Sequence, residues 1–464
     1  MSDIAIALAA LALLIVAAYR GYSVILFAPI AAMLAVLLTD PSAVPATFSS
    51  LFMDKLATFI KLYFPVFMLG AIFGKLIEIS GFSSAIVAAV IRLMGGGRAI
   101  LAIVLVCALL TYGGVSVFVV VFAAYPFAAE MFRQADIPKR LIPGTIALGA
   151  FTFTMDSLPG TPQIQNIIPT TFFGTTTWAA PILGLIGAIF ILALGLAYLS
   201  WARRRASAAG EGYGEGHVNE PISVSRESEV HPIAAAAPLL VVGIVNFTLT
   251  RAIPAYYPAE LNTSLAGLGV PLVTKLTTVS AIWAVEGGLL VGIATVIALA
   301  SRQIAGRLVE NMKPAIAGAL LASLNTASEY GFGAVIAVLP GFALIRAGLE
   351  AIPNPLVNEA VTVTVLSGVT GSASGGLSIA LAAMSEHFID AAKGAGISPE
   401  VLHRVASMAS GGMDTLPHNG AVITLLAVTG LTHRQSYRDI LAITAIKTAT
   451  VFFVILIYYA TGFI

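Results

Sequence analysis

Two near-copies of one polar stretch occur in the chain, MDSLPGTP at residues 155–162 and MDTLPHNG at residues 413–420. Each places an aspartate, a hydroxyl residue and a Leu-Pro pair inside long apolar surroundings. Proline lacks a backbone donor and clashes with the preceding helical turn, so both stretches predict the interruption of a helix. Their duplication indicates that one structural unit occurs twice.

The composition predicts an all-α polytopic membrane protein. Of 464 residues, 58% are hydrophobic and 10% are charged, and the mean hydropathy is +0.95. Soluble domains carry roughly 25% charged residues. Many apolar stretches approach the roughly 20 residues that cross a bilayer core. The lipid bilayer is therefore an expected partner. A net charge of +1 without a basic, aromatic-rich cluster predicts no nucleic-acid partner.

Lysine and arginine near the ends of apolar segments orient the chain, because these residues favour the cytoplasmic side. Arg20 closes the apolar residues 4–19, which we interpret as a first transmembrane helix, and WARRR at 201–205 closes another span. The resulting tracing predicts a multi-pass protein of the inner (cytoplasmic) membrane with both termini extracytoplasmic.

Two segments are predicted to be re-entrant hairpins. Residues 99–132 have Arg98 before them and Arg133 after them, so both ends are expected at the cytoplasmic side, with the tip at TYGGVS (111–116). Residues 355–392 are predicted to enter from the other side, with the tip at SGVTGSASGG (367–376).

Each hairpin is followed by a broken helix, at residues 140–178 and 399–432. The two units run in opposite orientations, so residues 1–201 and 233–464 are predicted to form an inverted-topology repeat. The Gly-, Glu- and Ser-rich residues 202–232 between them are predicted to be a flexible cytoplasmic linker.

This architecture predicts a secondary transporter. Non-helical backbone cannot face lipid, so the tips and breaks must meet one another or line a cavity. Inverted repeats whose broken helices meet near the midplane are typical of secondary transporters. Free helix N-termini suit the carboxylate of an anionic substrate, and exposed carbonyls and carboxylates suit a cation.

The candidate site residues lie at the tips, at the breaks and in the polar string SLNTASEYGFG (323–333). The candidates for substrate binding are Tyr112, Gly113, Gly114, Ser116, Ser157, Gly160, Thr161, Gln163, Asn325, Thr326, Ser372, Ser374, Gly375, Thr415, His418 and Asn419. The candidates for cation coupling are Asp156, Asp414, Glu329 and His418. Ionisable groups inside a membrane are functional candidates by default.

Structural alternatives exist for these residues. Asp156 and Asp414 can cap half-helices as well as shape the site. Burial disfavours the charged form of Glu329, which suits a proton carrier, but Glu329 can also make a structural hydrogen bond. His418 can titrate or donate to substrate. Lys447, in the last span, is expected to extend toward the cytoplasmic side, and His403 is expected at an interface.

The stretches GSASGGLSIA (371–380) and GISPE (396–400), with the broken helix after them, resemble the GntP gluconate permease family of the ion-transporter superfamily. The resemblance implies uptake of small hydroxylated monocarboxylates by cation symport, usually with protons. It also implies a homodimer, with a scaffold holding mobile hairpins and broken helices.

The chain departs from the gluconate branch at its first break and first tip. Gly160 and Thr161 stand where that branch carries histidine, and Gly113 stands where it carries an acidic residue. A shorter hydroxy acid such as 3-hydroxybutyrate is therefore expected at least as strongly as gluconate.

Other functions are less compatible with the sequence. It has no H-E-x-x-H, G-x-S-x-G or P-loop motif, so no enzyme activity, cofactor or ATP-driven pump is expected. The histidines lack a metal-ligand spacing, and the single Cys107 excludes an internal disulfide. A sodium-coupled carboxylate symporter, a cation/proton antiporter and a channel remain as alternatives.

Overall fold

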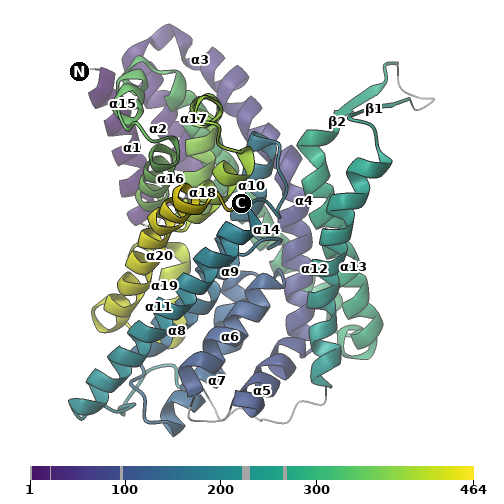
Figure 1. The fold of residues 1–464 in the computed structure, drawn as a ribbon, viewed down its shortest axis with the longest axis vertical. Coiled ribbons are helices and arrows are strands. Elements are labelled where there is room, and N and C mark those ends of the chain that lie inside the picture. Colours follow the sequence, from purple (N-terminus) through teal and green to yellow (C-terminus); the bar gives the residue numbers. More distant parts are fainter. Residues whose placement is uncertain (1–2, 21, 95–97, 222–229, 265–268, 418) are drawn as a thin grey trace.

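The structure, a computed structural model, describes residues 3–20, 22–94, 98–221, 230–264, 269–417 and 419–464, and helices make up most of it (Figure 1). The helices of the first half are α1 (Asp3–Tyr19), α2 (Val24–Thr39), α3 (Val44–Thr47), α4 (Met53–Ile79), α5 (Phe82–Met94), α6 (Ala99–Tyr112), α7 (Val117–Gln134), α8 (Leu141–Ala150), α9 (Phe153–Asp156), α10 (Ile164–Phe173) and α11 (Pro181–Ala208). A 3₁₀ turn (Pro41–Ala43) and a π-helical turn (Phe48–Phe52) flank α3.

The second half contains α12 (Pro232–Tyr256), α13 (Leu276–Ile304), α14 (Leu308–Val338), α15 (Pro340–Glu350), α16 (Pro355–Thr370), α17 (Ala373–Gly394), α18 (Pro399–Ser410), α19 (Gly420–Thr429) and α20 (His433–Thr461). Strands β1 (Glu260–Thr263) and β2 (Leu272–Lys275) pair antiparallel between α12 and α13. This small hairpin, which the sequence analysis did not predict, projects beyond the helices in Figure 1.

The helices have the lengths and composition of a membrane protein. Five helical segments among the described residues are long and apolar enough to cross a bilayer: Pro41–Ile79, Pro181–Ala208, Pro232–Tyr256, Leu276–Ile304 and His433–Thr461. Shorter apolar helices accompany them, as expected where hairpins and half-helices replace full spans. The chain is an all-α polytopic membrane protein, which confirms the predicted fold class.

The two halves repeat one pattern of helix contacts. In the first half α1 packs on α2 and α5 on α6, and in the second half α12 packs on α13 and α15 on α16. Contacts between the halves also come in matching pairs. Helix α2 of the first half packs on α14 of the second, and correspondingly α13 of the second half packs on α4 of the first. In the same way α1 packs on α15, and α12 packs on α5. Helices α4 and α14, which precede the two hairpins, pack on each other. This reciprocity is what a pseudo-twofold axis would produce, and the inverted repeat itself stays a prediction.

The broken helices take part in the same exchange. The second half-helix of the first unit, α10, packs on α17 and α18 of the second unit. The second half-helix of the second unit, α19, packs on α7 and α8 of the first. Each unit therefore completes the packing of the other.

Both hairpin tips turn through a glycine with positive φ. Between α6 and α7, Gly114 has φ +94°, and between α16 and α17, Gly371 has φ +65°. An L-residue rarely adopts this backbone conformation, so glycine is the residue that the turn requires. Ser372 then caps α17 by accepting a hydrogen bond from the Gly375 N–H at 3.0 Å.

The segment after α11 differs from the predicted linker. Helix α11 extends to Ala208, so residues 202–208 are helical, because the arginine-rich end continues the apolar span. Beyond the helix, Glu211 forms an ion pair with Arg140 at 2.7 Å, and Glu220 forms one with Lys139 at 2.8 Å. The hydrogen bond from Arg140 holds the pKa of Glu211 below its usual range. These ion pairs attach the described part of this segment to the loop that connects α7 and α8.

The packing of the second hairpin predicts the effect of one substitution. A Cβ at Gly376 of α17 would lie 2.2 Å from the backbone nitrogen of Ser367 in α16. Gly376→Ala should therefore force the two legs apart and destabilise the protein by about 1–3 kcal/mol, measured by thermal unfolding in detergent. Gly394→Ala is the control, since a Cβ at Gly394 meets nothing within 4 Å. Equal melting temperatures for the two variants would contradict the close approach of the legs.

Candidate functional site

Both duplicated stretches interrupt helices. In the first unit, α9 ends at Asp156, and α10 begins at Ile164 after the N-cap Gln163. In the second, α18 ends at Ser410, and α19 begins at Gly420 after the N-cap Asn419, whose side chain accepts from the Val422 N–H at 2.9 Å. Each break therefore places an aspartate beside backbone that is not part of a helix.

Lys447 of α20 joins the two aspartates. Its Nζ lies 3.2 Å from Oδ2 of Asp156 and 3.3 Å from Oδ1 of Asp414. The ammonium also donates to the carbonyl of Phe151, where α8 has just ended. All three ionisable side chains are buried, Lys447 at 1% exposed, Asp156 at 0% and Asp414 at 4%. We call Asp156, Lys447 and Asp414 the ion triad.

The position of Lys447 corrects the sequence-based prediction. Lys447 was expected to extend toward the cytoplasmic side, but it is buried and paired. A lysine can extend to the interface only where its own span end is close. Here two carboxylates from distant parts of the chain lie close to the Lys447 ammonium. Pairing with them stabilises the buried charge, which would be costly without a partner.

A second buried cation, Arg404 of α18, binds the first break through neutral groups. Its guanidinium donates to the carbonyl of Asp156 at 3.1 Å, to the carbonyl of Ala179 at 2.7 Å and to Oδ1 of Asn166 at 3.1 Å. Ser407, one turn further along α18, donates to the same Asp156 carbonyl at 2.8 Å. The peptide oxygen that the break frees is thus satisfied from the other unit.

His403 also differs from its prediction. It was expected at an interface but is fully buried in the protein, with Nδ1 2.6 Å from Oγ1 of Thr175 and Nε2 3.2 Å from Oδ1 of Asn166. Sequence reasoning did not identify Arg404. The available signal was an arginine inside a segment, residues 399–432, that was predicted to be a broken transmembrane helix.

Two side-chain amides fasten the hairpin tips to the breaks. Gln163, the N-cap of α10, donates to the carbonyl of Thr111 in the first tip at 2.8 Å. Asn419, the N-cap of α19, donates to the carbonyl of Gly371 in the second tip at 2.8 Å. Tyr112 adds a hydrogen bond from its hydroxyl to the carbonyl of Pro159 at 2.9 Å. The predicted proximity of tips and breaks is therefore present in both units.

Several candidates at the breaks interact with the protein itself. Ser157 donates to Oδ1 of Asp156 at 2.8 Å, and Thr161 donates to the carbonyl of Thr154 at 2.8 Å. Gly160 lies against Trp178, whose ring would clash with a Cβ at 2.3 Å. The Oγ1 of Thr415 lies 2.6 Å from Oγ1 of Thr444.

The candidate residues at the first tip differ in what surrounds them. A Cβ at Gly113 would meet Leu239 of α12 at 2.4 Å, so this glycine allows the tip to approach the neighbouring helix. Gly114 lies near Pro162 of the first break. Ser116 precedes α7 as its N-cap but makes no capping hydrogen bond with its side chain. The positive φ of Gly114 already accounts for glycine there, so among the described first-tip candidates Ser116 is the one whose side chain makes no hydrogen bond.

The polar string of α14 lies against the second hairpin rather than in the triad. Thr326 Oγ1 is 3.2 Å from Oγ of Ser374, and a Cβ at Gly375 would lie 1.9 Å from Oε2 of Glu329. The Glu329 carboxyl thus lies against the first turn of α17, where the helix dipole favours negative charge. Asn325 is partly buried on the same helix. His418 lies outside the described residues.

A further acidic residue, Glu359 of α16, was missed by the sequence analysis. It is fully buried, and neither carboxyl oxygen has a hydrogen-bond partner among the described residues. Oε2 of Glu329 likewise has none. The signal was present in the sequence, because Glu359 follows Asn358 in an apolar segment of the predicted hairpin. Within the part of the chain that is described, no group of three or more His, Cys, Asp or Glu could hold a metal ion.

Comparisons with known proteins assign the chain to a family. No family model matches it. It is 59% identical over 471 residues to a protein of Bacillus subtilis (strain 168) described as an uncharacterized transporter, YxjC, with 100% of both chains covered. The chain belongs to the YxjC transporter family. It is therefore a membrane transporter, and membership of the gluconate permease family stays a prediction.

The fold of this YxjC relative is similar to solved transporter structures. The YdaH transporter of Alcanivorax borkumensis matches with a TM-score of 0.50 and 17% identity, over 92% of this chain and 90% of that chain. MtrF of Neisseria gonorrhoeae, described within a class of antimetabolite efflux pumps, has a TM-score of 0.48 and 13% identity, over 87% and 82%. The likeness to YdaH bears on the fold alone.

The ion triad predicts that Lys447 stabilises the folded protein. Lys447→Met would leave two buried carboxylates without their cation, and removal of one member of a buried ion pair costs about 3–5 kcal/mol. Thermal unfolding of the purified protein measures this cost. Lys75→Met, which removes the partner of exposed Glu78, should cost at most about 1 kcal/mol.

Replacing the whole triad distinguishes lost pairing from lost packing. The variant Lys447→Met, Asp156→Asn, Asp414→Asn should recover most of the stability, because no unpaired charge remains. If Lys447→Met melts like Lys75→Met, the three groups do not form a buried ion network.

Proposed function

We propose that this transporter is a proton-coupled symporter of a small organic anion, and that the two helix breaks form its coupling site. The observation that carries the proposal is the ion triad, in which one lysine, Lys447, pairs with both duplicated aspartates at once. Titratable groups shared by two breaks can link proton binding to the relative position of the units.

The environment of Lys447 favours protons over sodium as the coupling ion. Two carboxylates and the freed carbonyl of Phe151 would together suit a monovalent cation, but the lysine ammonium already lies among them. With all three groups ionised the triad carries one net negative charge. A proton on one carboxylate removes that charge, whereas sodium would have to compete with a tethered cation.

Glu329 and Glu359 support proton coupling independently. An isolated carboxylate is very costly in a water-free interior, so a buried acid without a partner is better accommodated in its neutral form. Both glutamates are buried, and both have a carboxyl oxygen without a hydrogen-bond partner among the residues that the structure describes. They offer further positions for a carried proton within the second unit.

The predicted substrate is a small hydroxy monocarboxylate such as 3-hydroxybutyrate or a gluconate-like acid. The half-helices α10 and α19 and the hairpin leg α17 each begin beside a break or a tip. The first N–H groups of α10, whose N-cap Gln163 makes no capping hydrogen bond with its side chain, are suited to a carboxylate, and Ser116 is available for a substrate hydroxyl. The choice of hydroxy acid rests on the resemblance to gluconate permeases.

Uptake into proteoliposomes tests the proposal. Radiolabelled 3-hydroxybutyrate and gluconate are the probes, driven by an imposed proton gradient or by an imposed sodium gradient. We expect accumulation with the proton gradient, loss of accumulation with a protonophore, and none with sodium alone. Asp414→Asn should reduce gradient-driven accumulation at least tenfold while exchange of internal for external acid continues.

Two variants complete this experiment. Glu78→Gln, at an exposed ion pair, is the control and should transport like the wild type. Glu329→Gln separates the candidate carriers, since unchanged accumulation would assign coupling to the triad and not to Glu329. Accumulation that follows sodium and ignores the proton gradient would contradict the proposal.

A further inference from the structure

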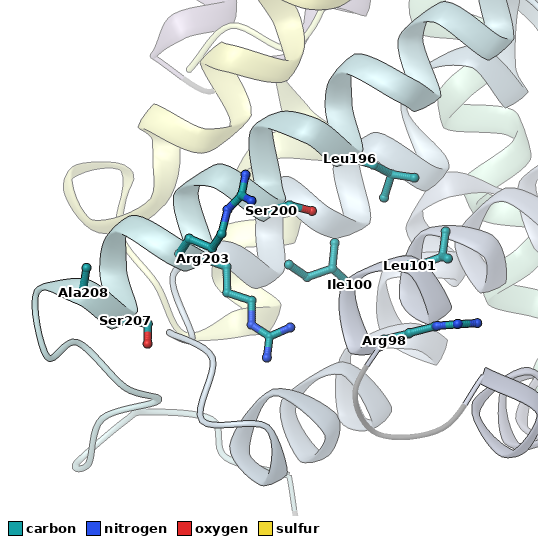
Figure 2. Close-up of a pocket in the computed structure, with 9 residues that line it drawn as sticks. Arg98, Ile100, Leu101, Leu196, Ser200, Arg203, Ser207 and Ala208 are labelled. Carbon is teal, nitrogen blue, oxygen red and sulfur yellow. The ribbon is translucent and has the colours of Figure 1, made fainter.

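A basic cavity lies away from the helix breaks, between the start of α6 and the end of α11. Its volume is about 770 Å³, and Figure 2 shows Arg98 and the first turn of α6 on one side and the last turns of α11 on the other. Arg98, Arg203 and Arg204 line it together with Ser200 and Ser207. Nothing in the proposed transport site uses these residues.

Among the described residues, the arginines of this cavity have no acidic partner. Across the described ranges, no carboxylate lies within ion-pair distance of Arg98, Arg203 or Arg204. Two other arginines of the same predicted side are paired instead, Arg133 with Glu220 and Arg140 with Glu211. The charge of the cavity is therefore available to an external anion.

The depth of the cavity matches the membrane interface. Trp201 of α11 is 43% exposed, and the Arg205 guanidinium lies 5.4 Å from the centre of its ring. Aromatic residues with basic neighbours are typical of the headgroup level. Closer to the start of α11, Ile189 is 61% exposed and Leu185 is 49% exposed, as expected for a surface that faces acyl chains.

The lining is amphipathic in the way that a lipid is. Leu196, Leu101 and Ile100 add apolar surface to the arginines and serines. Because Ile100 and Leu101 belong to the first turn of α6, the positive end of that helix dipole also faces the cavity. A free phosphate would use the charges but leave the apolar lining exposed to water.

We propose that this cavity binds an anionic phospholipid, with its phosphodiester between the arginines and its acyl chains along Leu196 and Leu101. Arginine and serine donors suit the phosphate oxygens, and basic pockets between membrane helices on the cytoplasmic side bind anionic headgroups. Helix α6 continues from the cavity to the first hairpin tip. A bound lipid would therefore fasten this hairpin to α11.

Lipid-dependent thermal stability tests the proposal. The full-length protein in neutral detergent is titrated with phosphatidylglycerol or with phosphatidylcholine. We expect phosphatidylglycerol to raise the melting temperature saturably and phosphatidylcholine to raise it much less. In Arg203→Gln, Arg204→Gln the apparent affinity for phosphatidylglycerol should fall about 30-fold, since each basic residue near an anionic surface contributes about 1 kcal/mol.

The control removes the same charge from outside the cavity. Arg205→Gln, Arg434→Gln changes one neighbour on α11 and one exposed arginine of α20, neither of which lines the cavity. It should retain the affinity of the wild type. Equal weakening in both double variants, or equal effects of the two lipids, would overturn the proposal. Saturable stabilisation by inorganic phosphate that phosphatidylglycerol cannot exceed would overturn it too, because the site would then bind a free anion.

Discussion

A buried lysine between two buried aspartates is the interaction on which the rest of this structure depends. Within a membrane protein an unpaired charge is costly, so the Lys447 ammonium tolerates burial because the carboxylates of Asp156 and Asp414 lie beside it. Each comes from a different part of the chain: the first break, the second break and the last helix. The requirement to pair them fixes how the two units sit against each other.

The hydrogen bonds around the triad also join the two units. A helix break frees backbone groups that lipid cannot satisfy. Arg404 and Ser407 of the second unit bind the carbonyl of Asp156 in the first, while Gln163 and Asn419 bind the carbonyls of the hairpin tips. The breaks are stable because the other unit and the hairpins provide partners. A site built in this way needs residues from both halves of the chain.

The fold was largely predictable because its determinants are local. Proline and glycine in the two duplicated stretches predict the breaks, and Gly114 and Gly371 allow the tight turns at the tips. The role of Lys447 was not predictable, since its partners lie far away in the sequence. Arg404 and His403 were missed or misplaced for the same reason. The β1–β2 hairpin was missed because its short strands lack a clear apolar alternation, and Glu359 was overlooked although it is an acid in an apolar segment.

The triad can be tested most directly by a double-mutant cycle between Asp156→Asn and Asp414→Asn, with the free energy of unfolding measured in detergent. With Lys447 present, the first neutralisation should cost little, because the lysine keeps one carboxylate. The double variant should be destabilised by at least about 1 kcal/mol more than the sum of the two single changes, because it leaves the ammonium of Lys447 without a carboxylate. In a Lys447→Met background the first neutralisation should instead stabilise, since it relieves two facing carboxylates. Additivity within about 0.5 kcal/mol in both backgrounds would contradict the ion triad as the interaction that joins the two breaks.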